Sequence, residues 1–138
     1  MNNHLIFSNK MADIYYEPEL KMMITIYHGI VEYDLLEEVI DLINNTAISN
    51  GINGSVADVS ELRGSYHKML GYMKEIGLPL LIENGYRVQA QIISDDLIMR
   101  NLSEKVGEIM KSLGVNFVTF TNRKEGEDWL RSVLSESS

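Results

Sequence analysis

Strand patterns and helical patterns alternate along most of this chain, after two strand patterns that open it. Residues 12–17 and 20–28 have the character of strands, and Pro18-Glu19 between them suits a tight turn, which predicts an N-terminal β-hairpin. Further strands are expected at residues 54–59, 87–94 and 115–121, and a helical pattern follows each strand after the first. Because helical crossovers join parallel strands, this order predicts an α/β fold: a hairpin, then β-α repeats, giving a mostly parallel five-stranded sheet with four helices.

The period of the apolar residues separates the strands from the helices. Val88, Ala90 and Ile92 alternate with polar residues, which is the two-residue period of a strand. In residues 32–50 the apolar positions recur every three or four residues, and Asn50-Gly51 suits the end of this helix. Asp95 and Asp96 can cap the helix that follows residue 94.

The helical pattern of residues 64–83 is interrupted. Gly71 and Gly77 weaken it, and Pro79 cannot continue the hydrogen-bond ladder. We therefore expect a break or kink between Ile76 and Pro79.

A chain of 138 residues is long enough for one domain that buries ~68% of the surface of its unfolded form. We expect this domain at residues 12–134, after a lead-in of residues 1–11 and before a disordered tail of residues 135–138. The lead-in offers only Leu5-Ile6-Phe7 as an apolar run, too short for a secretion signal, and no segment has the length of a membrane span. The expected location is the cytoplasm, without integral membrane association.

Charge and composition exclude several classes of function. The formal charge of −8 repels phosphate backbones, so nucleic acid is not an expected partner. The chain has no cysteine, which excludes disulfides, zinc thiolates and thiol nucleophiles. The three histidines form no pair at the spacing of metal ligands, so neither a metal nor another cofactor is expected.

Three stretches resemble a known family. They are Met23-Ile24-Thr25-Ile26-Tyr27-His28-Gly29, residues 56–64 with the sequence VADVSELRG, and Glu127-Asp128-Trp129-Leu130. Together with the order of elements, they resemble the SpoIIAA-like group of STAS domains, relatives of anti-sigma-factor antagonists that are also similar to the Sec14 lipid-carrier fold. The resemblance spans about residues 12–134 and implies a sheet with helices packed to one side, usually without enzymatic activity.

In the antagonist branch of this family, an Asp-Ser-Ser-Gly turn carries a serine that is phosphorylated. Ser65 occupies the nearest place here, but Arg63-Gly64-Ser65-Tyr66 departs from that pattern, which puts a kinase-driven switch in doubt. A phosphate on Ser65 would meet the free N–H groups of a helix start and the nearby Arg63. The alternative is a plain helix cap, because serine is common at such positions.

The carboxyl ends of parallel strands gather polar residues at one edge of the sheet. There we expect His28, Asp58, Ser60, Glu61, Ser94, Asp95, Asp96, Asn122 and Arg123. A phospho-accepting response regulator would need an acidic pair after the first core strand, where this chain has His28-Gly29. A Ser65–His67–Asp58 hydrolase triad lacks the nucleophile elbow, and residues two apart on a helix point to different faces.

Our leading hypothesis from the sequence is therefore a non-catalytic regulatory or interaction domain that binds a protein partner. The partner would contact a surface that we call the rim, made of Asp58, Ser60, Glu61, Arg63 and Ser65, together with the face of the second helix.

The alternative hypothesis is a small carrier or sensor for a lipid-like molecule. Met69, Leu70 and Met73 lie on the interrupted second helix, and methionine fills irregular cores but also lines adaptable binding surfaces. A helix of this kind can move away from the sheet and admit an apolar ligand. Self-association as a homodimer, through the hairpin face or the second helix, stays open.

Overall fold

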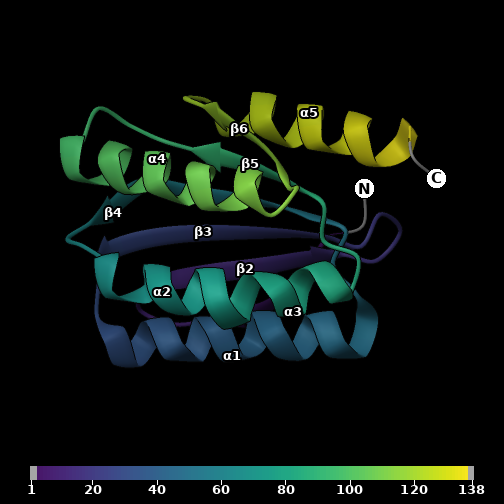
Figure 1. The fold of residues 1–138 in the computed structure, drawn as a ribbon, viewed down its shortest axis with the longest axis horizontal. Coiled ribbons are helices and arrows are strands. Elements are labelled where there is room, and N and C mark those ends of the chain that lie inside the picture. Colours follow the sequence, from purple (N-terminus) through teal and green to yellow (C-terminus); the bar gives the residue numbers. More distant parts are fainter. Residues whose placement is uncertain (1–2, 137–138) are drawn as a thin grey trace.

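The strands pair in the order in which they follow one another along the chain, and together they form a single six-stranded sheet (Figure 1). The computed structural model describes residues 3–136. The first three strands are antiparallel neighbours, and the third to sixth are parallel neighbours. The strands are β1 (His4–Ser8), β2 (Ala12–Glu17), β3 (Met22–Ile30), β4 (Gly54–Arg63), β5 (Val88–Ile92) and β6 (Asn116–Phe120).

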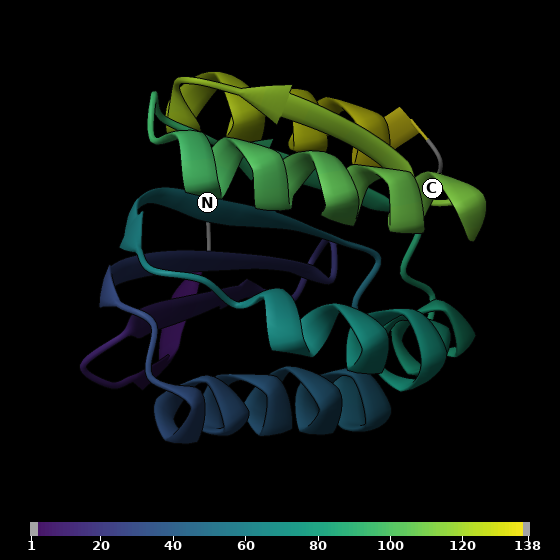
Figure 2. The same ribbon diagram turned by 60° about the vertical axis from the view of Figure 1, so that its left-hand side comes forward.

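Helices cover both faces of this sheet, and α1 lies beside α3 (Figures 1 and 2). Among residues 3–136, no helix is both long enough and apolar enough to cross a membrane. The helical elements are α1 (Tyr33–Asn50), a 3₁₀ turn (His67–Met69), α2 (Leu70–Tyr72), a π-helical turn (Met73–Gly77), α3 (Leu78–Glu83), α4 (Leu97–Ser112) and α5 (Arg123–Glu136). We refer to the consecutive elements of residues 67–83 as the second helical segment.

Buried side chains form one cluster on each face of the sheet. The larger cluster lies between the sheet and α1, the second helical segment and α4. On the opposite face, Leu130 and Leu134 of α5 cover Val56, Val88 and Ile92. The resemblance implies helices on one side only, and this expectation is wrong for α5. The inner strands β4 and β5 carry apolar residues on this second face too, and these residues need a cover to be removed from water.

The sheet has six strands where the sequence analysis predicts five, because residues 4–8 of the expected lead-in form β1. This strand pairs with β2 at the edge of the sheet, with a β-bulge between Leu5 and Phe7. The apolar run in β1 is too short to predict a strand from the sequence. The strand forms because its backbone pairs with β2. At the other end, α5 continues to Glu136, so the first half of the expected tail is helical. Residues 137 and 138 lie outside the described part.

The predicted interruption near Pro79 is a widened turn rather than a break. The backbone of the second helical segment stays helical from Met73 through Leu78. Pro79 has no N–H to donate, and its ring collides with the carbonyl one turn earlier in a regular α-helix. The π-helical turn relieves this conflict by letting the chain bulge at that point.

The predicted ends of two helices are confirmed. α1 ends at Gly51, which has a φ of 84° and donates its N–H to the carbonyl of Ala47 at 2.9 Å. Asp96 begins α4, because its carboxylate accepts a hydrogen bond from the N–H of Met99 at 2.9 Å. These two ends illustrate a left-handed glycine stop and a side-chain cap.

The surroundings of two glycines predict opposite effects for their Gly→Ala substitutions. A Cβ atom on Gly54 would lie 2.7 Å from Val88 Cγ1 and 3.0 Å from the Val88 carbonyl oxygen, so Gly54→Ala should destabilise by about 1–3 kcal/mol. A Cβ atom on Gly71, inside α2, meets nothing within 4 Å. Gly71→Ala should stabilise by roughly 0.5–1 kcal/mol. Urea unfolding measures both changes, and equal free energies of unfolding for the two variants would contradict the packing described.

Candidate functional site

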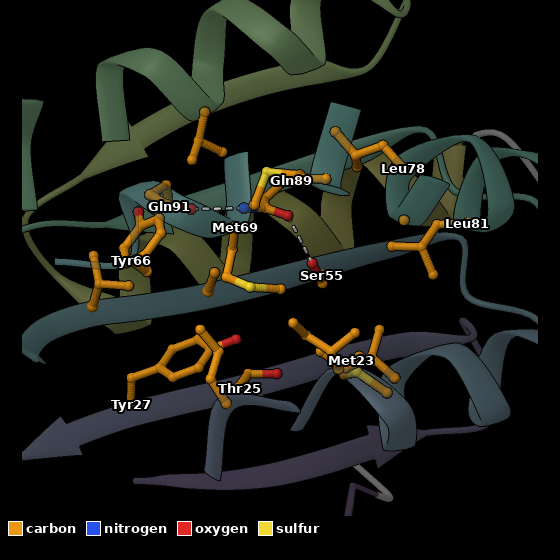
Figure 3. Close-up of a pocket in the computed structure, with 18 of the residues that line it drawn as sticks. Met23, Thr25, Tyr27, Ser55, Tyr66, Met69, Leu78, Leu81, Gln89 and Gln91 are labelled. Atoms are coloured by element: carbon orange, nitrogen blue, oxygen red, sulfur yellow. Dashed lines mark hydrogen bonds between the residues drawn. The ribbon is translucent and has the colours of Figure 1, made fainter. Parts of the chain in front are cut away.

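A cavity of about 160 Å³ lies between the sheet and the second helical segment (Figure 3). Its sheet side is formed by residues of β3, β4 and β5 that point to the same face. Met69, Met73, Leu78 and Leu81 line it from the second helical segment, and Val106 and Met110 line it from α4. The cavity therefore occupies the place where a regular, tightly packed helix would contact the sheet.

The accessibility of β4 confirms that this space is not filled by side chains. Ser55 and Ala57 lie on an inner strand, on a face that helices cover, and yet both are only partly buried. Their neighbours Val56 and Asp58, which point to the opposite face, are buried. Small side chains at positions 55 and 57 leave the floor of the cavity open.

One wall of the cavity is a ladder of hydrogen-bonded polar side chains on and beside β5. Gln89 and Gln91 are 6% and 2% exposed, and the Gln89 side-chain amide donates to the Gln91 oxygen at 2.6 Å. Gln91 in turn donates to Ser103 Oγ of α4 at 3.1 Å. The Gln89 oxygen accepts from the Tyr86 hydroxyl and from Ser55 Oγ, the latter at 3.2 Å. Burial of these amides is tolerated because each is paired.

Four tyrosines line the same space: Tyr72 from α2, and Tyr27, Tyr66 and Tyr86, whose pKa values are raised. Burial raises the pKa of Tyr66 to about 12, although hydrogen bonds from Ser103 and Gln91 act in the other direction. Burial also raises the pKa of Tyr27 and of Tyr86, and each is raised further by a neighbouring tyrosine. The three hydroxyl groups are therefore neutral at physiological pH.

The lining contains no acidic or basic side chain among the described residues. Apolar groups, hydroxyls and amides make up its whole surface. Since an isolated charge is costly to bury without a partner, such a cavity favours uncharged molecules. The chemistry that it offers is binding by apolar contact and by hydrogen bonds.

β4 runs to Arg63, beyond the expected strand of residues 54–59, so the rim predicted from the sequence spans the second half of this strand and the turn after it. The Asp58 carboxylate is engaged within the fold. Asp58 is buried and accepts hydrogen bonds from the Ser60 N–H at 3.0 Å and from Ser60 Oγ at 2.6 Å. Arg123, at the start of α5, lies 3.6 Å from its other oxygen. Glu61 is exposed. Asp58 thus ties the middle of β4 to α5.

Arg63 and Ser65 also have local partners. Arg63 pairs with Asp96 at 3.6 Å, and its guanidinium donates to the carbonyls of Ser60 and Leu62. Ser65 Oγ accepts a hydrogen bond from the His67 N–H at 3.2 Å, at the start of the 3₁₀ turn. Ser65 is exposed, and its bond forms a local serine turn just before the 3₁₀ turn, whose N-cap residue is Tyr66.

Other polar residues expected at this edge of the sheet also bond to nearby groups of the protein. Asn122 accepts from the Glu125 N–H at 3.0 Å at the start of α5, and Ser94 Oγ accepts from the Asp96 N–H at 3.3 Å. His28 lies 3.5 Å from Asp13 of the neighbouring strand. Among residues 3–136, no group of three or more His, Cys, Asp or Glu side chains could hold a metal ion.

Exposed apolar side chains surround the rim. Ile30 at the end of β3 is 69% exposed, and Leu97 and Ile98 at the start of α4 are 80% and 57% exposed. Ile30 pairs with Arg63 in the sheet, and Asp96, which pairs with Arg63, directly precedes Leu97. Ser65, His67 and Ile98 line a common shallow depression.

Two of the three residues predicted to contact an apolar ligand line the cavity, namely Met69 and Met73. Leu70 packs against the larger buried cluster and does not belong to the lining. The sequence analysis missed the polar wall formed by Ser55, Tyr66, Tyr86, Gln89 and Gln91. Gln89 and Gln91 in a strand expected to lie inside the sheet could have indicated this wall, because an inner strand covered on both faces is normally apolar on both.

No family model and no curated protein matches this sequence. Among solved structures, it is similar to an uncharacterized protein of the DUF3478 family with a SpoIIAA-like fold from Shewanella loihica PV-4. That similarity covers 94% of this chain and 92% of the other, at 18% identity and a TM-score of 0.54. The chain is also similar to apo-SiaC from Pseudomonas aeruginosa, over 86% of this chain and 98% of that one, at 17% identity and a TM-score of 0.49.

The first of these similarities extends over nearly the whole of both chains, and it agrees with the resemblance read from the sequence. At this level of identity the common property is the architecture. The protein has a SpoIIAA-like fold.

Proposed function

We propose that this protein is a non-catalytic sensor or carrier domain that binds a small, uncharged and mainly apolar molecule in the cavity. The observation that supports this most directly is the partial exposure of Ser55 and Ala57 on an inner strand beneath a helical cover. Protein interiors are normally close-packed, and a cavity of this size costs stability. A fold that keeps such a space is explained by a molecule that fills it.

The size of the cavity narrows the range of ligands. At about 160 Å³ it resembles cavities that hold a single benzene-sized ring. A long acyl chain would need the second helical segment to move away from the sheet. The alternative hypothesis from the sequence, a carrier or sensor for a lipid-like molecule, is therefore narrowed to a compact ligand.

The cavity lies next to the part of the rim that carries Arg63 and Ser65. Leu62 and Tyr66 line the cavity, and each is adjacent in the chain to a rim residue, Arg63 or Ser65. A ligand that shifts these two side chains would alter the loop that carries the rim. The proposed sensor thus has a route from the binding site to an outer surface.

The second candidate function is binding of a protein partner at the rim, as the leading hypothesis from the sequence holds. The exposure of Ile30, Leu97 and Ile98 around the rim favours it, because apolar side chains grouped on a surface are typical of interaction sites. The two functions are compatible, since a ligand sensor needs an output surface.

A cavity-filling substitution tests the binding site. Ala57→Ile adds a β-branched side chain at the floor of the cavity, and we expect it to abolish binding of para-xylene and to stabilise the protein by about 1 kcal/mol. Isothermal titration calorimetry and thermal unfolding measure the two effects. Thr119→Ile, on an exposed position of β6, is the matched control and should bind para-xylene like the wild type. Undiminished binding to Ala57→Ile would place the ligand elsewhere.

The buried tyrosines predict a loss of stability at alkaline pH. Tyr66 has a pKa raised from 10.0 to about 12 in the folded state, so unfolded chains ionise first and folding stability falls as the pH rises through this range. The difference corresponds to about 2–3 kcal/mol for Tyr66 alone. Melting temperatures measured from below pH 10.0 to about pH 12 should fall more steeply for the wild type than for Tyr66→Phe. Parallel curves for the two proteins would argue against a buried hydroxyl at this position.

Substitutions beside the rim test the second candidate. Leu97→Gln with Ile98→Gln removes two exposed apolar side chains without touching the cavity, and we expect it to weaken binding of a rim partner at least tenfold. Affinity capture followed by quantitative mass spectrometry identifies the partner, and sedimentation velocity detects a second copy of this chain in that role. Ile48→Gln, at a site 62% exposed on α1, is the control. Equal losses for both variants would mean that the rim is not the contact surface.

A further inference from the structure

Two hydroxyl groups on the cavity side of β3 lack a hydrogen-bond partner. Thr25 is 2% exposed, and it and Tyr27 both line the cavity. Within the described residues, neither hydroxyl takes part in a hydrogen bond with another group of the protein. Neither oxygen is among the fully enclosed side-chain atoms that lack a partner, so both open onto the cavity, where a bound molecule could pair with them.

The two hydroxyls lie on the same side of the cavity. Positions 25 and 27 are two residues apart on one strand, so their side chains point to the same face, and Figure 3 shows both at the β3 side of the space. In the sheet, Thr25 pairs with Ala57, and Ala57 pairs with Gln91. The small Ala57 side chain therefore separates the unpaired hydroxyls from the glutamine ladder and leaves room above it.

The opposite wall differs in its hydrogen bonding. Gln89 and Gln91 bond to each other, and the ladder continues to Ser103, Ser55 and Tyr86. These groups are already occupied by one another. Elsewhere in the lining, Asn44 donates to the Tyr72 hydroxyl at 2.8 Å, and the Tyr66 hydroxyl bonds to Ser103 and Gln91. Among the described lining residues, Thr25 and Tyr27 are thus the hydroxyl-bearing side chains without a hydrogen bond to the protein, and both lie on the β3 side.

These observations define the polar part of a ligand. A hydroxyl group can both donate and accept, so Thr25 and Tyr27 suit an oxygen that does either. The absence of charged side chains from the described lining calls for an uncharged molecule, and the volume of about 160 Å³ calls for one of ring size.

We propose that the ligand is a small neutral ring compound with one hydroxyl or carbonyl oxygen, held by the hydroxyls of Thr25 and Tyr27 above Ala57. This inference rests on the proposed binding function and adds the class of molecule and the residues that recognise it. The rest of the ring contacts the methionines and leucines of the second helical segment.

The test compares two probes of nearly equal shape, para-cresol and para-xylene, in which a hydroxyl replaces a methyl group. Their dissociation constants are measured by isothermal titration calorimetry for the wild type, Thr25→Val, Tyr27→Phe and the double variant. We expect each substitution to shift the ratio of the two constants toward para-xylene by about threefold to tenfold. Para-xylene itself should bind each variant at least as well as the wild type.

Two controls keep the outcomes distinct. Thr46→Val removes a hydroxyl that bonds the Leu42 carbonyl on α1, away from the cavity lining, and should leave the ratio unchanged. Melting temperatures show whether each variant folds. If para-xylene binds but the ratio is the same in all variants, the assignment of Thr25 and Tyr27 is wrong while the binding function stands. If neither probe binds the wild type, both proposals fail.

Discussion

The hydrogen-bonded ladder of Gln89 and Gln91 is the constraint on which the cavity side of the molecule depends. Both amides lie on an inner strand and are almost completely buried, so each must find partners within the fold. Their partners come from three elements: Ser55 on β4, Tyr86 before β5 and Ser103 on α4. The same bonds that satisfy the glutamines thus fix α4 against the sheet and hold one wall of the cavity.

The space beside this wall persists because of two features of its surroundings. Small residues at positions 55 and 57 lower the floor, and the second helical segment, with its π-helical turn, does not pack as a regular helix would. Methionines at positions 69 and 73 adapt to such an irregular contact. Such a space costs stability, because its lining lacks the contacts that close packing would give.

The opposite face is held by charges rather than by a polar ladder. From Glu17 on β2, ion pairs run through Arg131, Glu127 and Arg123 on α5 to Asp58 in the middle of β4. This chain of alternating charges aligns α5 across the sheet, while its leucines provide the apolar contact. Asp58, expected from the sequence to face a partner, is therefore part of the scaffold. The exposed apolar residues near it are the better candidates for contact.

The sequence alone determined the class of fold, because the periods of apolar residues reflect strand and helix geometry directly, and it singled out Met69 and Met73, which line the cavity. It also placed the ends of α1 and α4, where local chemistry at Gly51 and Asp96 is sufficient. Only the tertiary structure decided the rest. Three features depend on residues distant in the chain: the edge strand β1, the helical cover on the second face and the polar wall. The sequence shows that Gln89 and Gln91 lie on a strand, but it does not show which groups their amides bond to. Whether two hydroxyls on β3 lack partners is likewise a property of how the layers meet.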